Sequence, residues 1–473
     1  MSDRTGTANS LWTAADAVRA TNGVTAGAWQ ASGVSIDTRS LAPGDLFVAL
    51  AGPNHDAHDY VPSALNAGAA AAMVRAGARN LPETSKLLKV LDTEEGLRSL
   101  ARFARSRSNA RICAVTGSVG KTGTKELLAA ALGSAGSVTA TAGNLNNHFG
   151  LPLSLARMPA NADFGVFEMG MNHANEITPL SEIARPHVAI ITSIAPVHIE
   201  FFDSIDGIAA AKAEIFDGLV EGGDAVINAD QDHFEFLAAR ARARGAGRVL
   251  SFGESEAAYG KLLSCRIDAD GTHVEADILG NRLSYKLQLR GRHWAMNSLA
   301  VLLAADACGV DLPQAAESLN AVEPPKGRGR ALKISTGSGP ATVIDETYNA
   351  SPVAVRAAID LLAQTAPGDG GRRIAVLGDM LELGGRSAEE HAGLAPALIN
   401  AGIDQVFVCG QYMSDIMNAL PGEMRGGSAC SSAKLAPMVA EAVHAGDLVM
   451  IKGSAGARMG AVVDALSGNG GRA

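Results

Sequence analysis

The amino-acid sequence predicts an α/β protein built from three domains. Short apolar runs alternate with helix-like stretches along the chain, and several of these runs end in glycine turns. This alternation is typical of mostly parallel sheets covered by helices. The length of 473 residues corresponds to about three domains. We place them at residues 1–108, 109–321 and 322–473.

Composition favours a soluble enzyme, with 47% hydrophobic and 19% charged residues. The net charge of -9, without any basic run, argues against a nucleic-acid surface. Five scattered cysteines without a C-x-x-C pair indicate neither a disulfide framework nor zinc, and Cys113 and Cys409 lie in apolar runs typical of a core. Residues 1–5 contain no signal-like apolar core, and stretches such as 188–197 are too short to span a bilayer. We expect a cytoplasmic protein without integral membrane contact.

The first domain shows the pattern of a small α/β unit. Short strands are predicted at 32–37 and 45–50, and an alanine-rich helix near 61–68.

The second domain opens with the most informative segment of the chain. An apolar run at 112–115 leads into Thr116, Gly117, Ser118, Val119, Gly120, Lys121 and Thr122. A strand that passes through a glycine loop into a helix points backbone N–H groups at an anion, Lys121 can reach the outer phosphates, and Thr122 can contact magnesium. The structural alternative is a strand-to-helix turn that merely favours glycine, but such a turn would not require Lys121 and Thr122 after Gly120. We therefore expect ATP binding, although Val115 replaces the usual first glycine, which points away from ordinary kinases and GTPases.

Further strands are predicted at 164–168, 187–192 and 225–228, and polar residues follow two of them. Ligands collect at the carboxyl ends of parallel strands, so Glu168 is a candidate magnesium ligand, with a helix cap or surface acid as the alternative. His198 follows the next strand, and by itself is more typical of a hydrogen-bonded core histidine. Lys212 fits a solvated helix lysine equally well.

A Pro-Gly-Arg segment at 324–330 predicts a hinge or linker before the third domain. Runs at 374–377, 406–408 and 448–451 then lead into glycine turns, as in a Rossmann-like sheet.

Together these segments resemble the Mur ligase family over essentially the whole chain. In the central domain, the matching motifs are 116–122, 141–147 with Gly150 and Pro152, 168–170, His198, 212–215, and 291–293 with Asn297. The other domains add 35–39, 44–50, 55–60, 326–330, 345–352, 378–384 and 452–454. The motifs of the third domain are those of the ligase that acts last in the family's pathway.

The resemblance implies an N-terminal UDP-sugar-binding domain, a central P-loop-type ATPase domain and a C-terminal Rossmann-like ligase domain. It implies an ATP-driven amide bond between the terminal carboxylate of UDP-MurNAc-tripeptide and the amine of D-alanyl-D-alanine. The carboxylate would first be phosphorylated to an acyl phosphate, and the product would be UDP-MurNAc-pentapeptide for peptidoglycan synthesis. ATP and Mg²⁺ are the implied cofactors, and we expect a monomer.

The resemblance also implies roles for single residues. Lys121, Glu168, His198 and Lys212 would be catalytic; Thr122, Glu168, His198 and a carbamylated Lys212 would hold magnesium. The nucleotide would be bound by the loop 116–122 and by His293, Asn297, Arg328 and Asp345, with Asn297 at the adenine, Asp345 at the ribose and Arg328 at the phosphates. The structural alternatives are helix capping for Asn297, turn formation for Asp345 and a solvated linker position for Arg328.

Substrate contacts are implied in all three domains, at Ser35, Asp37, Thr38, Arg39, Asp45, Asn144, Asn146, Asn147, Tyr348, Asn349 and Lys452. Two positions depart from the family pattern, because Trp294 and Ser351 each stand where the family has asparagine. Trp294 could pack against the adenine or fill core.

Three other functions stay open at this stage: another Mur-type or folylpolyglutamate-type amide ligase, a small-molecule kinase or ATPase, and a non-catalytic binding protein on the same scaffold. The sequence also leaves open whether the tripeptide ends in meso-diaminopimelate or lysine.

Overall fold

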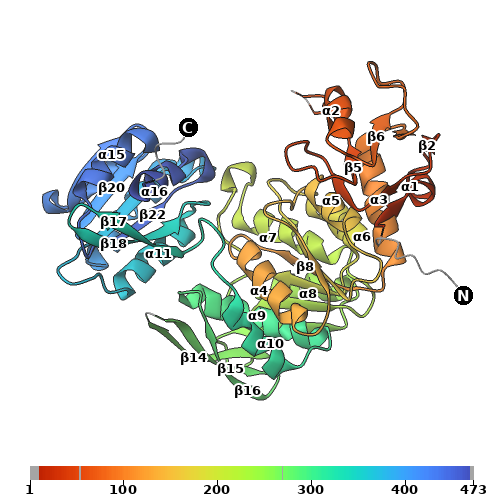
Figure 1. Ribbon diagram of the computed structural model, residues 1–473. Coiled ribbons are helices and arrows are strands. Elements are labelled where there is room, and N and C mark those ends of the chain that lie inside the picture. Colours follow the sequence, from red (N-terminus) through yellow and green to blue (C-terminus); the bar gives the residue numbers. More distant parts are fainter. Residues whose placement is uncertain (1–9, 53–54, 269, 469–473) are drawn as a thin grey trace, which may run out of the picture.

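The computed structural model describes residues 10–52, 55–268 and 270–468, which form three lobes that follow one another along the chain (Figure 1). The N-terminal residues 1–5, considered above for a signal segment, lie outside this range. None of the helices in the described ranges combines the length and the apolar character needed to cross a membrane.

The N-terminal lobe contains a five-stranded sheet in the order β2-β7-β6-β5-β4, parallel except for the edge strand β2, and a small β1-β3 pair. Its strands are β1 Trp12–Thr13, β2 Val24–Thr25, β3 Gln30–Ala31, β4 Gly33–Ser35, β5 Asp45–Val48, β6 Ala71–Arg75 and β7 Leu87–Val90. Its helices are α1 Ala14–Thr21, α2 Val61–Asn66 and α3 Thr93–Arg107.

The central lobe is built on a nine-stranded sheet in the order β16-β15-β14-β13-β12-β11-β8-β10-β9. Its strands are β8 Arg111–Thr116, β9 Val138–Ala140, β10 Phe164–Glu168, β11 Val188–Ile191, β12 Asp224–Asn228, β13 Arg248–Gly253, β14 Gly260–Asp268, β15 Gly271–Ile278 and β16 Asn281–Leu287. Its helices are α4 Lys121–Gly133, α5 Gly150–Ala156, α6 Ile177–Ala184, α7 Ile205–Ala213, α8 Phe234–Ala243, α9 Arg292–Ala307 and α10 Leu312–Ser318. Strands β8 to β14 run parallel, and β14 to β16 form an antiparallel meander at one edge.

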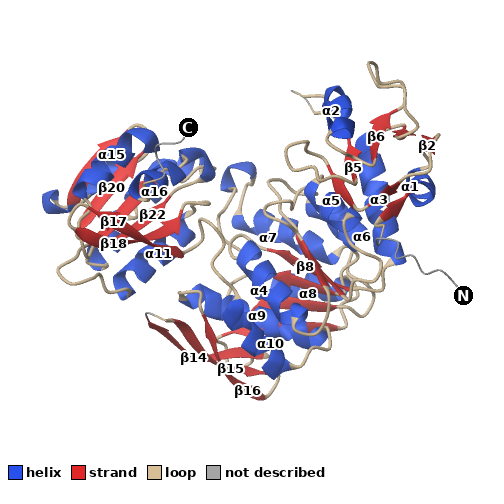
Figure 2. Ribbon diagram, viewed as in Figure 1, coloured by secondary structure: helices blue, strands red, loops and turns tan. Residues whose placement is uncertain are grey.

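Helices cover both faces of this central sheet (Figure 2), which explains why its strands are almost continuously apolar. Successive side chains of a strand point to opposite faces. In β8, Cys113 and Val115 pack under α4 and α9, whereas Ile112 and Ala114 pack under the helices of the other face. The sheet therefore has two cores, and the end of β8 is held rigidly between them.

The C-terminal lobe has a six-stranded sheet in the order β17-β18-β22-β19-β20-β21, parallel except for the β17-β18 hairpin. Its strands are β17 Arg330–Thr336, β18 Gly339–Glu346, β19 Arg373–Gly378, β20 Gln405–Cys409, β21 Arg425–Ala429 and β22 Leu448–Lys452. Its helices are α11 Pro352–Gln364, α12 Ser387–Ala392, α13 Ala395–Asn400, α14 Ser414–Ala419, α15 Ser432–Ala442 and α16 Gly460–Leu466.

The predicted α/β class is confirmed, and each strand named from the sequence occurs, with ends shifted by a few residues. The helix expected near 61–68 is α2, and Cys113 and Cys409 are buried in core clusters as predicted. The sequence did not identify the β14–β16 meander or the β17-β18 hairpin, because their exposed edge faces lack a strong apolar pattern. The two predicted domain boundaries, at 108/109 and 321/322, remain predictions.

The N-terminal lobe is attached to the central one through α3 and α5. The Trp12 indole N–H donates to the carbonyl of Ala156 at 2.8 Å, and Arg157 Nε donates to the carbonyl of Val34 at 2.7 Å. Leu153 belongs to the same apolar cluster as the N-terminal strands. The Asn144–Asn147 loop just before α5 is therefore held close to the N-terminal lobe.

Candidate active site

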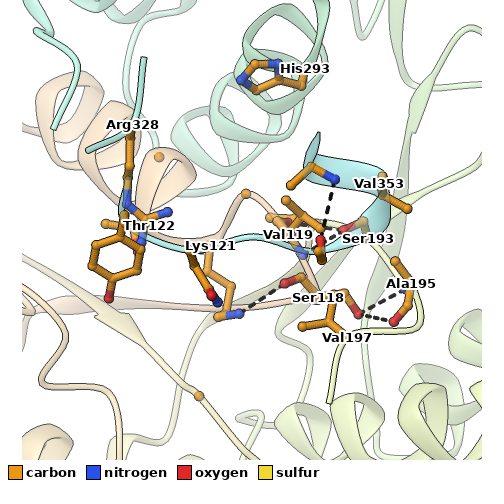
Figure 3. Close-up of a pocket in the computed structure, with 18 of the residues that line it drawn as sticks. Ser118, Val119, Lys121, Thr122, Ser193, Ala195, Val197, His293, Arg328 and Val353 are labelled. Carbon is orange, nitrogen blue, oxygen red and sulfur yellow. Dashed lines mark hydrogen bonds between the residues drawn. The ribbon is translucent and has the colours of Figure 1, made fainter. Parts of the chain in front are cut away.

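A cavity of about 730 Å³ opens where the central lobe meets the C-terminal lobe. It is lined by the β8–α4 loop, the loop before α5, the ends of β10 and β11, the start of α9 and residues 327–361 of the C-terminal lobe. Figure 3 shows part of this lining, including Lys121, Thr122 and His293 from the central lobe and Arg328 from the segment before β17. The lining thus combines segments more than 200 residues apart, as in a site completed by two lobes.

The β8–α4 loop has the geometry of an anion-binding turn. Gly117 and Gly120 adopt φ values of 148° and 91°, which strongly favour glycine. A Cβ atom at Gly117 would lie 1.9 Å from Thr192 Oγ1. Because Gly120 is the N-cap of α4 and has no side chain to cap the helix, the first-turn N–H groups are left to an anion.

The loop is held in place by the segment that follows β11. Ser118 Oγ donates to the carbonyl of Ala195 and accepts from its N–H, both at 2.9 Å (Figure 3), and the Ser118 N–H donates to the carbonyl of Ser193 at 2.8 Å. Thr116 is fully buried, donates its hydroxyl to the carbonyl of Met169, and does not line the cavity. Thr116, Gly117 and Ser118 therefore shape the loop through protein contacts.

Lys121 and Thr122 are the loop residues that offer polar side chains to the cavity. Lys121 Nζ donates to the carbonyl of Gly117 at 2.7 Å. Burial lowers the pKa of Lys121, an effect that nearby Glu168 opposes and Arg328 reinforces. Arg328 Nη2 donates to Thr122 Oγ1 at 3.0 Å, and its guanidinium carbon lies 3.8 Å from the centre of the Tyr348 ring. The predicted phosphate-facing cation is therefore delivered to the phosphate loop by a segment outside the central lobe.

Glu168, at the end of β10, is 2% exposed and lines the cavity. Its Oε1 accepts from Asn146 Nδ2 at 2.7 Å. Its Oε2 is buried and has no hydrogen-bond partner among the described residues. It is thus neither a helix cap nor a surface acid, and a buried carboxylate oxygen without a donor suits a cation.

His198 occupies a left-handed backbone position, φ 62°, just before a short 3-10 helix, Ile199–Phe201. Its Nδ1 lies 2.5 Å from Glu382 Oε2 of the C-terminal lobe. Burial lowers the pKa of His198; Glu382 opposes this, and the positive charges of Lys121 and Lys212 reinforce it. His198 is consequently a contact point between lobes as well as part of the cavity lining.

Lys212, on α7, is 2% exposed and is not the solvated helix lysine that the sequence also allowed. Burial, followed by the charge of Lys121, lowers the pKa of Lys212 well below its usual value. Its side chain does not line the cavity. Its surroundings favour the neutral amine that carbamylation requires.

These side chains suit a magnesium ion that keeps most of its ligands from substrate and water. No group of three His, Cys, Asp or Glu residues within the described ranges forms a protein-only metal cage. Magnesium in phosphate-transfer sites is commonly held by one or two carboxylates together with substrate phosphates. The free oxygen of Glu168, beside the phosphate loop, fits this pattern.

The start of α9 packs closely on the phosphate loop. A Cβ atom at Gly120 would lie 2.9 Å from Asn297 Nδ2, and one at Gly123 would lie 2.4 Å from the Trp294 ring. Trp294 is 6% exposed. The Trp294 side chain therefore packs in the core against α4 and also forms part of the cavity lining. Asn297 lies against the phosphate loop.

Asp345 and Glu346 at the end of β18 have different roles. Asp345 is buried and outside the lining; its carboxylate accepts from Gly327 N–H at 3.1 Å and from the Thr347 hydroxyl at 2.6 Å. These bonds fit the turn-forming alternative, and the ribose contact of Asp345 stays a prediction. Glu346, which was not predicted from the sequence, lines the cavity. Successive side chains of a strand point to opposite faces, so Asp345 and Glu346 cannot both face the cavity.

Lys452 completes the C-terminal side of the cavity. It is 4% exposed, and its Nζ donates to Glu346 Oε2 and to the carbonyl of Asn349, both at 3.1 Å. Ser351, the second departure from the family pattern, is the N-cap of α11 and accepts from the Ala354 N–H. Serine is a favoured cap, which explains why asparagine is replaceable there.

The structure brings most of the predicted residues to the cavity lining. Those in the lining are Ser118, Val119, Gly120, Lys121, Thr122, Asn144, Asn146, Asn147, Glu168, His198, His293, Asn297, Arg328, Tyr348, Asn349 and Lys452. Those outside it are Ser35, Asp37, Thr38, Arg39, Asp45, Thr116, Gly117, Lys212 and Asp345. Unpredicted polar residues in the lining include Asn172 and Glu176, which follow β10, and Glu346, the last residue of β18.

The predicted residues of the N-terminal lobe form a local structure of their own. Arg39 pairs with Asp37 on the surface at 2.6 Å. The Asp45 carboxylate accepts from the N–H of Ala42 at 2.9 Å and lies against Gly33, so it stabilises the turn before β5.

Comparison with protein families gives matches along most of the chain. The Mur ligase family, catalytic domain, matches residues 30–105; the Mur ligase middle domain matches 115–305; and the Mur ligase, glutamate ligase domain, matches 329–455.

Individual proteins agree with these matches. A UDP-N-acetylmuramoyl-tripeptide--D-alanyl-D-alanine ligase of Rickettsia prowazekii is 34% identical over 431 residues, covering 91% of this chain and 94% of the relative. A crystal structure of MurF from Acinetobacter baumannii superposes with a TM-score of 0.84 at 28% identity, covering 97% of this chain and 99% of that one. MurF ligase from Thermotoga maritima in complex with ADP gives a TM-score of 0.76 at 28% identity, covering 92% and 97% of the two chains. This chain belongs to the Mur ligase family.

Proposed function

We propose that the protein is an ATP-dependent ligase that joins D-alanyl-D-alanine to UDP-MurNAc-tripeptide, giving UDP-MurNAc-pentapeptide, ADP and phosphate in peptidoglycan precursor synthesis. The observation that carries this proposal is the full-length similarity to relatives named for this reaction. The cavity supports it, because a phosphate loop faces cationic and polar groups from a second lobe.

The chemistry requires activation of a carboxylate, whose delocalised negative charge makes it a poor electrophile. Transfer of the terminal phosphoryl group to it gives an acyl phosphate, which the amine then attacks with loss of phosphate. Both steps build negative charge on transferring oxygens. Lys121, from the phosphate loop itself, and Arg328, which donates to Thr122 of that loop from the C-terminal lobe, would stabilise that charge.

The Mg²⁺ requirement and the modification of Lys212 are part of the proposal. Thr122, Glu168 and His198, with carbamylated Lys212, would hold magnesium, which when bound neutralises phosphate charge and orients the phosphoryl group. The free oxygen of Glu168 and the lowered pKa of Lys212 support these roles. Carbamylation would turn a neutral amine into an anion and so add a negative charge near Lys121.

The nucleotide would lie in the cavity over the phosphate loop, with Asn297 and His293 at the start of α9 toward the base. Glu346 is a better candidate than Asp345 for the ribose, since the Asp345 carboxylate already accepts backbone and hydroxyl donors.

The acceptor amine would approach from the C-terminal lobe, where Tyr348, Asn349 and Lys452 line the cavity. The lining asparagines Asn144, Asn146 and Asn147 would contact the tripeptide, and the Ser35–Arg39 turn with Asp45 would contact the UDP-sugar. Holding an acyl phosphate and an amine at attack distance can lower the barrier by about 7 to 11 kcal/mol. Two lobes that share one cavity are suited to this task.

Two further expectations complete the proposal, namely that the protein acts as a monomer and in the cytoplasm. Size-exclusion chromatography with light scattering tests the first, and cell fractionation the second.

The decisive experiment incubates the protein with ATP, Mg²⁺ and UDP-MurNAc-tripeptide, with and without D-alanyl-D-alanine, and measures phosphate release and product mass. A pentapeptide formed only with the dipeptide is expected. A product with another amine would indicate a different amide ligase, and phosphate release without any amide product would indicate an ATPase. Parallel reactions with meso-diaminopimelate and lysine tripeptides determine the third residue.

A further inference from the structure

Lys125 is a buried lysine that the proposed mechanism does not use. It lies on α4, one helical turn beyond Lys121, is 1% exposed and does not line the cavity. Burial of an ammonium group is costly unless partners compensate for the lost water. The contacts of Lys125 therefore indicate what its charge is used for.

The ammonium of Lys125 has two partners within the described part of the chain. Its Nζ donates to the carbonyl of Thr141 at 2.7 Å and lies 2.6 Å from Oε1 of the neighbouring Glu126, a partly exposed side chain. Thr141 is 1% exposed and directly follows β9. The lysine thus connects the helix of the phosphate loop to the end of another strand.

Thr141 in turn holds Glu168. Its hydroxyl accepts from the backbone N–H of Glu168 at 3.0 Å, and its own N–H donates to the carbonyl of Val166 at 3.0 Å. The backbone N–H, the carbonyl and the hydroxyl of Thr141 are all engaged, and two of these bonds go to β10.

The segment that begins at Thr141 also fixes the Glu168 side chain. Five residues on, Asn146 donates to Glu168 Oε1 at 2.7 Å, and its carbonyl accepts from the Gly170 N–H at 2.9 Å. Backbone and side chain of Glu168 are therefore both held by residues 141–146, whose first residue is tied to Lys125. Among the described residues, Oε2 of the carboxylate has no hydrogen-bond partner.

We infer that Lys125 is a positioning residue: through Thr141 it sets the free oxygen of Glu168 relative to the phosphate loop, so that a divalent cation can bind both the carboxylate and a nucleotide phosphate. The inference rests on the proposed function, in which Glu168 faces that cation. Residues that orient a metal ligand typically change metal affinity by about 10- to 100-fold when replaced.

The test uses three substitutions and a matched control. Lys125→Met keeps the apolar stem and removes the donor, Thr141→Val removes the hydroxyl at similar volume, and Thr141→Ser restores the hydroxyl. Thr124→Val is the control, because Thr124 neighbours Lys125 on α4, is fully buried, and its hydroxyl has no hydrogen-bond partner among the described residues.

The readout is Mn²⁺ binding in the presence of ADP, followed by electron paramagnetic resonance, together with metal-free ADP binding and the thermal midpoint. We expect Mn²⁺ to bind about 10-fold more weakly to Lys125→Met and Thr141→Val. Thr141→Ser and Thr124→Val should remain within about twofold of the parent protein, and metal-free ADP binding should be unchanged in all four.

Unchanged Mn²⁺ affinity in Lys125→Met would overturn the inference, and so would an equal loss of metal-free ADP binding, which indicates a general disturbance of α4. If Lys125→Met does not fold, the comparison of Thr141→Val with Thr141→Ser tests the link from Thr141 to Glu168 through which Lys125 would act. Equal Mn²⁺ affinity in these two variants would overturn the inference, and weaker binding in Thr141→Val alone would support it. Amide formation by the parent protein is measured separately: metal and ADP binding with the expected variant pattern, but without amide product, would refute the proposed function and leave the positioning role supported.

Discussion

The substitution Gly123→Ala tests how closely α4 must pack on α9 for the nucleotide site to form. An added Cβ would lie 2.4 Å from Cζ3 and 2.6 Å from Cη2 of Trp294, which is too close for either atom to remain in place. Overpacking of a core costs about 1–3 kcal/mol, and alanine regains about 1 kcal/mol of helix propensity. Because a rigid indole cannot yield as an aliphatic chain can, we expect a net loss of about 1–2 kcal/mol.

For a domain of this size, such a loss lowers the thermal midpoint by about 2–8 °C. Gly123 directly follows Thr122, so displacement of α4 should also raise the KM for ATP. Differential scanning calorimetry and a coupled phosphate-release assay measure both effects. Gly133→Ala, on the last residue of the same helix, is the control, because its Cβ would meet only Val138 Cγ2 at 3.9 Å; it should leave the KM unchanged and should not lower the midpoint.

A second substitution at Trp294 makes the test specific. Trp294→Leu removes the ring atoms that oppose the new Cβ, so the double variant should be more stable than the sum of the two single losses predicts. The packing argument is refuted if Gly123→Ala behaves like Gly133→Ala, or if the two losses simply add.

Four further predictions concern charge. Lys121→Ala should reduce ATP-dependent turnover at least about 100-fold in the phosphate-release assay; near-normal rates would remove Lys121 from the mechanism. Lys212→Ala should lose activity that added formate or acetate partly restores, and a normal rate without these acids would contradict carbamylation. Arg328→Ala should raise the KM for ATP about tenfold through loss of a charged hydrogen bond to the phosphate loop, and an unchanged KM would show that this contact is dispensable. Burial, with three nearby arginines, lowers the pKa of His187 to about 4, so the neutral ring stabilises the fold fully above about pH 6.5 and this contribution is lost as the pH falls toward 4. His187→Asn should reduce that acid sensitivity, measured from urea midpoints between pH 4 and 7; equal acid sensitivity in both proteins would contradict it.

Much of the fold could be predicted from local patterns. The central strands of the parallel sheets, such as β8, β10, β11 and β12, are buried on both faces, and such strands are largely apolar. The β14–β16 meander and the β17 edge strand could not be recognised in this way, because one face of each is exposed and their residues are mixed. The phosphate loop was recognisable because its chemistry depends on consecutive residues.

The rest of the site depends on residues that are distant in sequence. The choice between Asp345 and Glu346 follows from which side of β18 faces the cavity, and the choice between a solvated and a buried Lys212 follows from what covers α7. Neither the side of β18 that faces the cavity nor the cover over α7 can be inferred from a local motif. The same is true of Lys125. Its sequence context is that of an ordinary helix lysine, and only the fold brings its ammonium to the carbonyl of Thr141 at the end of β9.

The sequence by itself determined the α/β class, the phosphate loop and the family resemblance, because backbone conformation and loop chemistry depend on residues close together in the chain. Only the tertiary structure decided that Arg328 reaches Thr122, that Trp294 packs on Gly123 and that Glu168 keeps one carboxylate oxygen free. These contacts arise where separate strands, helices and lobes meet, and burial at those meeting points sets which side chains are satisfied within the protein and which remain available to a ligand.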